Sequence, residues 1–450
     1  MLTRRATLKL ERWSKQPQHK PLIIRGARQV GKTTLVKKFG EQFDCFIYLN
    51  LELHLDRRVF EQDLPIEQII QAIFFQKKLT YIPSKRTLIF IDEIQTSPEA
   101  VSLLRYFYEA YPDIHVIATG SLLETLIDTN ISFPVGRVEY LYLYPLTFEE
   151  FLMAIEEPQA LEALCMDQPP TYAHQSLLEL FHSYCMVGGM PEIVASFAQN
   201  KDLVKLGPIY ESLLTGYQDD VEKYARDKAQ TRVIRHIIAH ASYQAGSRIK
   251  FQHFGQSEYG SRDVGEAMRI LEKALLIKLV YPTTALKPPF EPNHKKSPRL
   301  QFLDTGLMNY SVGLQQEFFS LSDLNNLYQG KITEHIVGQQ LLATETVTQQ
   351  RLLFWVRDKS QSSAEIDYVI PQGNQLIPIE IKSGKTGSMR SLHSFIDHSE
   401  HAIFAIRLYH GKFSRETITS LGGKEFELLS LPYYLCGQLK RYLDRGLSCA

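Results

Sequence analysis

The stretch GARQVGKTT, residues 26–34, has the residue types and the spacing that hold a nucleoside triphosphate. Its two glycines allow backbone N–H groups to turn inward around phosphate oxygens without a clash from a Cβ atom. Lys32 supplies a cation for the β- and γ-phosphates, and the hydroxyl of Thr33 suits Mg²⁺. The pattern therefore predicts a P-loop that binds ATP and Mg²⁺ through Gly26, Ala27, Arg28, Gln29, Val30, Gly31, Lys32, Thr33 and Thr34.

Two adjacent acids, Asp92 and Glu93, directly follow the apolar run LIFI. Open α/β sheets place ligands at the carboxyl ends of their strands, so we expect both acids beside the P-loop. Asp92 would hold the water shell of Mg²⁺, and Glu93 would polarise the water that attacks the γ-phosphate. The alternative is a solvated strand end, which the upstream P-loop makes the weaker interpretation.

Three further residues are candidates for contact with the γ-phosphate. Thr119 and Ser121 end the apolar run IHVIA, and either one could sense the phosphate or simply cap the next helix. Arg137 could contact the phosphate in cis, or from a neighbouring subunit of a homo-oligomer as an arginine finger. An ordinary surface arginine remains the alternative.

A second group of candidate residues lies near the C-terminus, on two apolar runs joined by PQGNQ. Side chains alternate along a strand, so Glu380 and Lys382 share a face, and the turn can bring Asp367 beside Glu380. Two carboxylates suit Mg²⁺, and the lysine could activate water or stabilise a phosphate. Glu334, on a preceding helix, could complete the metal shell. The alternative is a hairpin whose charges face water.

The secondary-structure elements around and between these two sites must position their residues. Residues 22–24 read as a buried strand before the P-loop, and a helix follows the loop. Helical periodicity from 150 to 228, broken at DQPPTY and MVGGMPE, predicts a helical lid over the nucleotide. From 229 to 290 the order helix, short helix, helix from about Ser261, strand is typical of a winged helix-turn-helix. Its charges are mainly basic before Lys250 and mixed after it, so DNA contact and a structural role both remain open.

Composition narrows the class of protein. The chain has 450 residues, too many for one ordinary core, and a formal net charge of zero. The net charge of the chain therefore does not attract it to nucleic acid or to a membrane, and any basic surface must be local. Its five cysteines form no CxxC pair, and no apolar run approaches the roughly 18 to 20 residues of a spanning helix. These features predict a cytoplasmic protein without a membrane partner.

Five motifs together resemble one known group: GARQVGKTT, LIFIDEIQ, ATGS, VGRVEYLYLYPLTFEEF and VGGMPE. The chain is similar to the bacterial and archaeal AAA-type ATPases that carry a C-terminal domain of unknown function 4143. The resemblance covers nearly the whole sequence. It implies a P-loop ATPase domain first and a restriction-endonuclease-like fold last, with the residue order D…E-x-K of such nucleases intact.

The expected fold class is therefore α/β, in four parts. They are a P-loop ATPase domain of the AAA type at 1–155, a helical lid or linker at 156–228, a winged helix-like domain at 229–297 and a restriction-endonuclease-like α/β domain at 298–450. The expected function is ATP binding and hydrolysis coupled to action on nucleic acid, with DNA favoured over RNA. The alternative is a nucleotide-dependent switch that binds a protein partner through an inactive nuclease-like domain.

Overall fold

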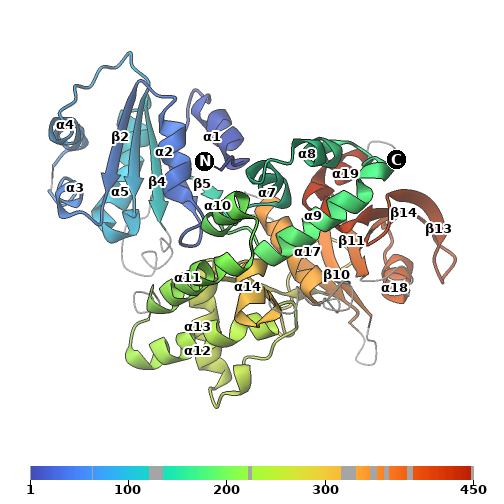
Figure 1. Ribbon diagram of the computed structural model, residues 1–450. Coiled ribbons are helices and arrows are strands. Elements are labelled where there is room, and N and C mark those ends of the chain that lie inside the picture. Colours follow the sequence, from blue (N-terminus) through green and yellow to red (C-terminus); the bar gives the residue numbers. More distant parts are fainter. Residues whose placement is uncertain are drawn as a thin grey trace.

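The structure is a computed structural model that describes residues 2–62, 64–120, 134, 136–220, 225–315, 331–344, 352–358, 364–382 and 389–446. Figure 1 shows the N-terminal sheet at one side of the molecule and the C-terminal sheet at the other. Helices join the two sheets and extend below them. In the part of the chain described, none of the helices combines the length and the apolar character that crossing a membrane requires.

The N-terminal sheet is parallel, with the strand order β2-β3-β4-β1-β5. Successive residues of its strands alternate between two hydrophobic clusters: Ile24 belongs to one and Ile23 to the other. Both faces are therefore covered, which explains why these strands read as continuous apolar runs. The strands are β1 (Leu22–Arg25), β2 (Cys45–Asn50), β3 (Thr87–Asp92), β4 (Ile114–Gly120) and β5 (Glu139–Tyr142).

Helices cover both faces of this sheet. The apolar residues of α1 and α2 pack with one cluster, and those of α4 and α5 pack with the other. Ser97 caps α5 by accepting a hydrogen bond from the Ala100 N–H. The elements are α1 (Ala6–Ser14), α2 (Lys32–Gly40), α3 (His54–Arg58), α4 (Ile66–Gln76), the 3₁₀ turn η1 (Ile94–Thr96) and α5 (Pro98–Ala110).

The segment after the sheet forms a series of helices, as the periodicity from 150 to 228 predicted. Its first helix begins with a capping box, in which Thr147 and Glu150 each bond the other's backbone N–H. The segment contains α7 (Phe148–Ala154), α8 (Pro158–Cys165), η2 (Thr171–Ala173), α9 (His174–Val187), α10 (Pro191–Asn200), η3 (Val204–Leu206) and α11 (Gly207–Asp220).

The next segment places two helices before a small antiparallel sheet of β6 and β8. It contains α12 (Lys228–Gln244), η5 (Phe254–Gln256), α13 (Ser261–Lys273), β6 (Ile277–Val280), β7 (Pro282–Thr283), β8 (Arg299–Phe302) and α14 (Thr305–Ser311). Strand β8 follows the boundary expected at residue 297, yet it pairs with β6. The Asp304 side chain accepts a hydrogen bond from the Leu307 N–H and so caps helix α14 at its start.

The C-terminal sheet is mixed, with the order β13-β14-β12-β11-β10-β9-β7. The predicted hairpin is confirmed, because β10 pairs antiparallel with β11 and Tyr368 lies opposite Ile379. The elements are α17 (Lys331–Thr344), β9 (Leu353–Val356), β10 (Glu365–Gln372), β11 (Gln375–Lys382), α18 (Arg390–His398), β12 (Phe404–Tyr409), β13 (Ser414–Thr419), β14 (Glu425–Pro432), η6 (Tyr433–Gln438) and α19 (Leu439–Gly446).

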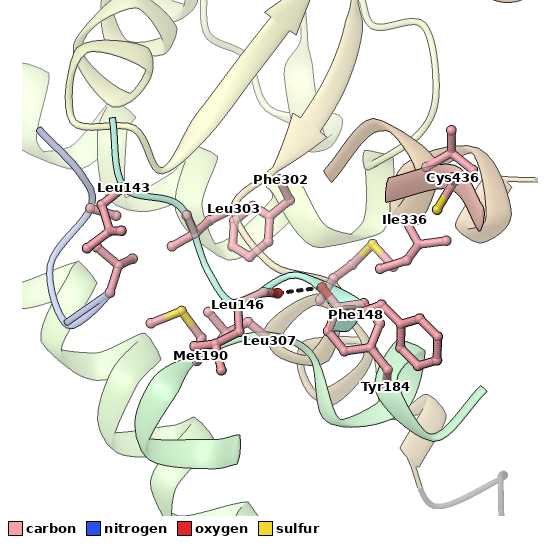
Figure 2. Close-up of a cluster of buried hydrophobic side chains, with 14 of the residues drawn as sticks. Leu143, Leu146, Phe148, Tyr184, Met190, Phe302, Leu303, Leu307, Ile336 and Cys436 are labelled. Carbon is pink, nitrogen blue, oxygen red and sulfur yellow. Dashed lines mark hydrogen bonds between the residues drawn. The ribbon is translucent and has the colours of Figure 1, made fainter. Parts of the chain in front are cut away.

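One hydrophobic cluster extends from the N-terminal sheet to the C-terminal sheet. Figure 2 shows its centre, where the Tyr184 hydroxyl donates a 2.7 Å hydrogen bond to the Leu146 carbonyl. The side chains come from segments far apart in the sequence: Leu143, Leu146, Phe148, Tyr184, Met190, Phe302, Leu303, Leu307, Ile336 and Cys436. The segments on either side of this centre are therefore packed into a shared core.

Candidate functional site

The P-loop connects β1 to α2, as its sequence predicts. Gly31 precedes the helix with a φ of 92°, a backbone conformation that glycine adopts without strain. Lys32 is the first helical residue, and its Nζ lies 2.9 Å from the Gly26 carbonyl oxygen and 2.8 Å from that of Ala27. Burial lowers the pKa of Lys32 to about 8, although Glu93 and Asp92 oppose the shift.

Asp92 is the centre of a hydrogen-bond network at the carboxyl end of β3. Thr33 Oγ1, in the first turn of α2, donates a 2.9 Å hydrogen bond to Asp92 Oδ2, and the Tyr48 hydroxyl donates at 3.2 Å to the same oxygen. The Thr119 hydroxyl, on the buried strand β4, donates to the other carboxylate oxygen. The strand order β3-β4-β1 brings these residues together. The Thr33 hydroxyl and Asp92 carboxylate present the oxygen donors that Mg²⁺ prefers, so this pair fits the ion.

Glu93 follows Asp92 in the left-handed backbone region, with a φ of 53°. This conformation is costly for a residue with a Cβ atom, on the order of 1–3 kcal/mol. Gln95 Nε2 donates a hydrogen bond to Glu93 Oε2, and Thr96 Oγ1 donates to the Glu93 carbonyl. These hydrogen bonds hold Glu93 in the turn after β3, next to Asp92 at the carboxyl end of the strand.

Arg137 lies at the amino ends of the strands, whereas the P-loop lies at their carboxyl ends. Strand β5 runs parallel to β1, with Glu139 opposite Leu22 and Tyr142 opposite Arg25. Arg137 precedes β5, whereas the P-loop follows β1, so the length of β1, about 10 Å or more, separates them. Arg137 Nε is instead 2.9 Å from Glu109 Oε1 in an exposed ion pair. Of the alternatives for Arg137, this position does not favour the cis contact with the γ-phosphate. Ser121 lies outside the described residues.

The C-terminal candidate residues lie side by side on β10 and β11. Asp367 Oδ2 accepts a 2.7 Å hydrogen bond from the Ile381 N–H, which places its carboxylate against β11. Lys382 Nζ lies 2.5 Å from Glu380 Oε1, and Glu380 is buried. Burial and Asp367 raise the pKa of Glu380 to about 7, while Lys382 opposes the shift.

An arginine that the sequence analysis missed lies among these acids. Arg299, on β8, has Nη1 3.1 Å from Glu334 Oε2 and Nη2 3.4 Å from Asp367 Oδ1, and it also pairs with Glu365. Glu334 was expected to complete a metal shell with Asp367 and Glu380, but here it pairs with Arg299, which also contacts Asp367. Among the described residues, no group of three or more His, Cys, Asp and Glu side chains is arranged to hold a metal ion. Burial and Asp367 raise the pKa of Glu334 to about 8, although Arg299 opposes the shift.

Three protein-family profiles match the chain in succession. A profile described as an AAA domain matches residues 18–152, one described as a domain of unknown function (DUF8612) matches 178–317, and one described as a domain of unknown function (DUF4143) matches 329–428. The chain carries an AAA domain followed by a DUF4143 domain. The resemblance drawn from the motifs is thereby confirmed. No curated protein matches the sequence.

Several solved structures are similar to parts of the chain. The Walker-type ATPase PABY2304 of Pyrococcus abyssi is 15% identical, with a TM-score of 0.45 over 69% of this chain and 96% of its own. The ORC1 protein of Aeropyrum pernix in complex with DNA is 11% identical, with a TM-score of 0.27 over 71% and 95%. The Pif1 helicase from Candida albicans is 11% identical, with a TM-score of 0.24 over 40% and 48%.

Arg4 supports the P-loop of the AAA domain from outside its motif. Its Nη1 donates a 2.9 Å hydrogen bond to the Val30 carbonyl, and its Nη2 donates at 2.6 Å to the Tyr144 carbonyl. Its Nε lies 3.2 Å from Glu150 Oε1, and both side chains are buried. Sequence analysis missed Arg4, because no local pattern distinguishes it from the neighbouring arginine.

Helix α11 also contacts the P-loop. Arg28 Nη1 is 3.0 Å from Asp220 Oδ1, and the Tyr217 hydroxyl donates a 3.1 Å hydrogen bond to the Arg28 carbonyl. Asp220 is buried rather than solvated, so its charge is part of this contact. The helical segment therefore reaches the P-loop through both a side chain and the backbone.

Arg4→Lys is expected to weaken ATP binding by about five- to tenfold. The lysine keeps a cation beside Glu150 but loses the planar fork that holds the Val30 and Tyr144 carbonyls, worth about 1–1.5 kcal/mol. Arg5→Lys is the matched control, since Arg5 pairs with Glu149 in a partly exposed site. Calorimetric titration with Mg·ATP measures both variants. Equal affinities would show that Arg4 does not position the P-loop.

Proposed function

We propose that the chain hydrolyses Mg·ATP in its AAA domain and that the nucleotide state controls its DUF4143 domain. The observation that carries the proposal is the convergence of Lys32, Thr33 and Asp92 at one edge of the N-terminal sheet. In P-loop enzymes this edge positions the triphosphate, and catalysis consists mainly of positioning and charge stabilisation.

Each residue of the site has a distinct role in this proposal. Lys32 binds the β- and γ-phosphates, while Thr33 and Asp92 hold Mg²⁺, which neutralises charge that develops on the phosphate oxygens. Glu93 orients the attacking water. Thr119 positions Asp92 through its buried hydroxyl. Arg137 could act only on the nucleotide of a neighbouring subunit, which makes a homo-oligomer part of the test of its role.

The segment MVGGMPE provides a route from the nucleotide to the rest of the chain. A Cβ atom at Gly31 would lie 3.6 Å from Pro191 Cγ, so this proline is beside the P-loop. The Gly189 N–H donates a 2.6 Å hydrogen bond to Asp304 Oδ2, and Gln339 Nε2 on α17 donates to the same oxygen at 3.1 Å. A displacement of the P-loop toward Pro191 would therefore act on a segment that is hydrogen-bonded to Asp304 at the start of α14, and Asp304 is bonded to α17.

Nucleic acid is the target that the C-terminal candidate residues favour, with DNA ahead of RNA. The order α17, β9, β10, β11, α18, β12 and the acids of β10 and β11 support a restriction-endonuclease-like domain. The order α12, η5, α13, β6, β8 supports a winged helix that precedes it. Asp367 and Glu380 would hold a divalent ion there, and Lys382 would stabilise charge on the phosphate.

We expect metal-dependent cleavage of DNA that is lost in the double variant Glu380→Ala/Lys382→Ala. The variant removes one ligand and the cation that accompanies it, so the cleavage rate should fall by about 10²–10³-fold. The assay uses single- and double-stranded DNA and RNA with Mg²⁺ or Mn²⁺, in the presence and absence of ATP. Lys412→Ala/Glu416→Ala, which removes an exposed lysine and an exposed acid of the same sheet region, is the control.

The opposite outcome selects the alternative function. If the wild-type chain turns over ATP but cuts none of these substrates, the DUF4143 domain is not a nuclease. The protein is then a nucleotide-dependent switch, and a protein partner is the target. Arg299 among the acids is the observation that favours this second function, because it supplies the positive charge that a metal would bring.

A further inference from the structure

A cavity of about 510 Å³ lies between the AAA domain and the C-terminal end of the chain. Its wall is formed by α1, by the connection from β5 to α7, and by parts of α17, η6 and α19. This volume is within the range of about 300–1,000 Å³ that is usual for small-molecule sites. None of the nucleotide-site residues from Gly26 to Thr34 lines it, so it is separate from the site described above.

The wall of this cavity is strongly basic. Its lining residues include six cationic side chains and two carboxylates, a formal charge of +4 that the pairing of Arg5 with Glu149 reduces to +3, in a chain whose net charge is zero. The cations are Arg4, Arg5, Lys9, Arg12, Lys440 and Arg441. Positions 5, 9 and 12 have the spacing of one helix face, and 440 and 441 come from a helix at the other end of the sequence. Like charges gathered around one space repel each other, which an anion in that space would relieve.

Several of these cations already have fixed positions. Arg4 is held by Glu150 and by the P-loop, and Arg5 Nη1 is 3.0 Å from Glu149 Oε2. Arg441 donates hydrogen bonds to the carbonyls of Cys165 and Met166. Arg12 and Lys440 are exposed, and within the described ranges neither takes part in an ion pair. The cavity thus combines a preorganised basic wall with two cations that can close on a ligand.

We propose that this cavity binds a small molecule that carries phosphate groups. Guanidinium groups match phosphate oxygens with parallel hydrogen bonds, and lysines add point charges. An ion with a single charge would neutralise only part of the wall, so a ligand with two or more phosphates is the best match. Because Arg4 also donates to the Val30 carbonyl, the ligand would share a side chain with the P-loop.

The test uses inorganic tripolyphosphate as the probe and the full chain with Lys32→Ala as the background. This substitution removes the P-loop lysine, so the cavity can be measured by difference. Arg12→Glu/Lys440→Glu in that background is expected to weaken tripolyphosphate binding by at least about tenfold. Lys15→Glu/Lys205→Glu, which reverses two exposed lysines outside the cavity, should change the affinity less than about twofold.

Two outcomes overturn the proposal: equal affinity in the cavity variant and its control, or no binding of the probe at all. Melting curves of both double variants verify that they fold. A second arm adds a short oligodeoxythymidylate as a competitor. If it displaces tripolyphosphate and its own binding depends on Arg12 and Lys440, the phosphates belong to a nucleic-acid strand and the small-molecule assignment is overturned. If it fails to displace the probe, the small-molecule assignment stands.

Discussion

Lys32→Ala should lower ATP turnover by about 10²–10³-fold or more, because the P-loop loses the lysine that its motif assigns to the β- and γ-phosphates. The side chain is buried, and its ammonium donates hydrogen bonds to the Gly26 and Ala27 carbonyls. Lys38→Ala, which removes an exposed lysine from the same helix, is the control. Steady-state phosphate release measures both variants.

A pH series gives an independent readout of the same residue. Since burial lowers the pKa of Lys32 to about 8, its ammonium is lost as pH rises through that value in the nucleotide-free protein. The affinity of the wild-type chain for ATP should therefore decline above about pH 8, and Lys32→Ala should lack this decline. Unchanged turnover in Lys32→Ala would remove the assignment of this loop as the ATP site.

Arg299→Ala should lower the free energy of unfolding by about 3–5 kcal/mol at neutral pH. The variant leaves Glu334, Glu365 and Asp367 close together without the guanidinium that pairs with all three. Arg248→Ala is the control, because Arg248 contacts Glu365 at 3.3 Å from a more exposed position. Its loss should cost less than about 1 kcal/mol. Urea unfolding followed by circular dichroism measures both.

The deficit of Arg299→Ala should also depend on pH. The pKa of Glu334 is already raised to about 8 in the folded chain, and removal of the cation raises it further. A carboxyl whose folded pKa exceeds its unfolded pKa, near 4.3, contributes less stability as pH rises between those values. The deficit should therefore be largest above about pH 8 and should shrink toward pH 5. A deficit that is constant with pH would show that lost packing, rather than charge, is the cause.

The sequence was most informative where chemistry and local structure share one short stretch. Gly26 to Thr34 holds the turn residues, the phosphate cation and the helix start together, so the strand, the loop and the helix could all be predicted. The same holds for β10 and β11, where the turn PQGNQ and alternating side chains predict that Asp367 and Glu380 meet. In both cases the contacts join residues close in the chain.

The features that could not be predicted from the sequence depend on contacts between residues that are far apart in the chain. Arg137 lies at the amino ends of the strands because β5 pairs parallel with β1, and nothing in the sequence near Arg137 specifies that pairing partner. Arg299 reaches acids that are 35 to 68 residues further along the chain, so no local spacing connects them. Arg4 likewise meets Glu150 across 146 residues. Such contacts depend on how the elements pack.

The continuous core of Figure 2 limits how this protein can be divided. A fragment that ended where the AAA profile ends, at residue 152, would leave the apolar side chains of Leu143, Leu146 and Phe148 without most of their neighbours. Exposed apolar surface of that kind favours aggregation. Replacing either domain with that of another protein would alter this shared core. We therefore expect substitutions on one side of the junction to be tolerated only with matching changes on the other.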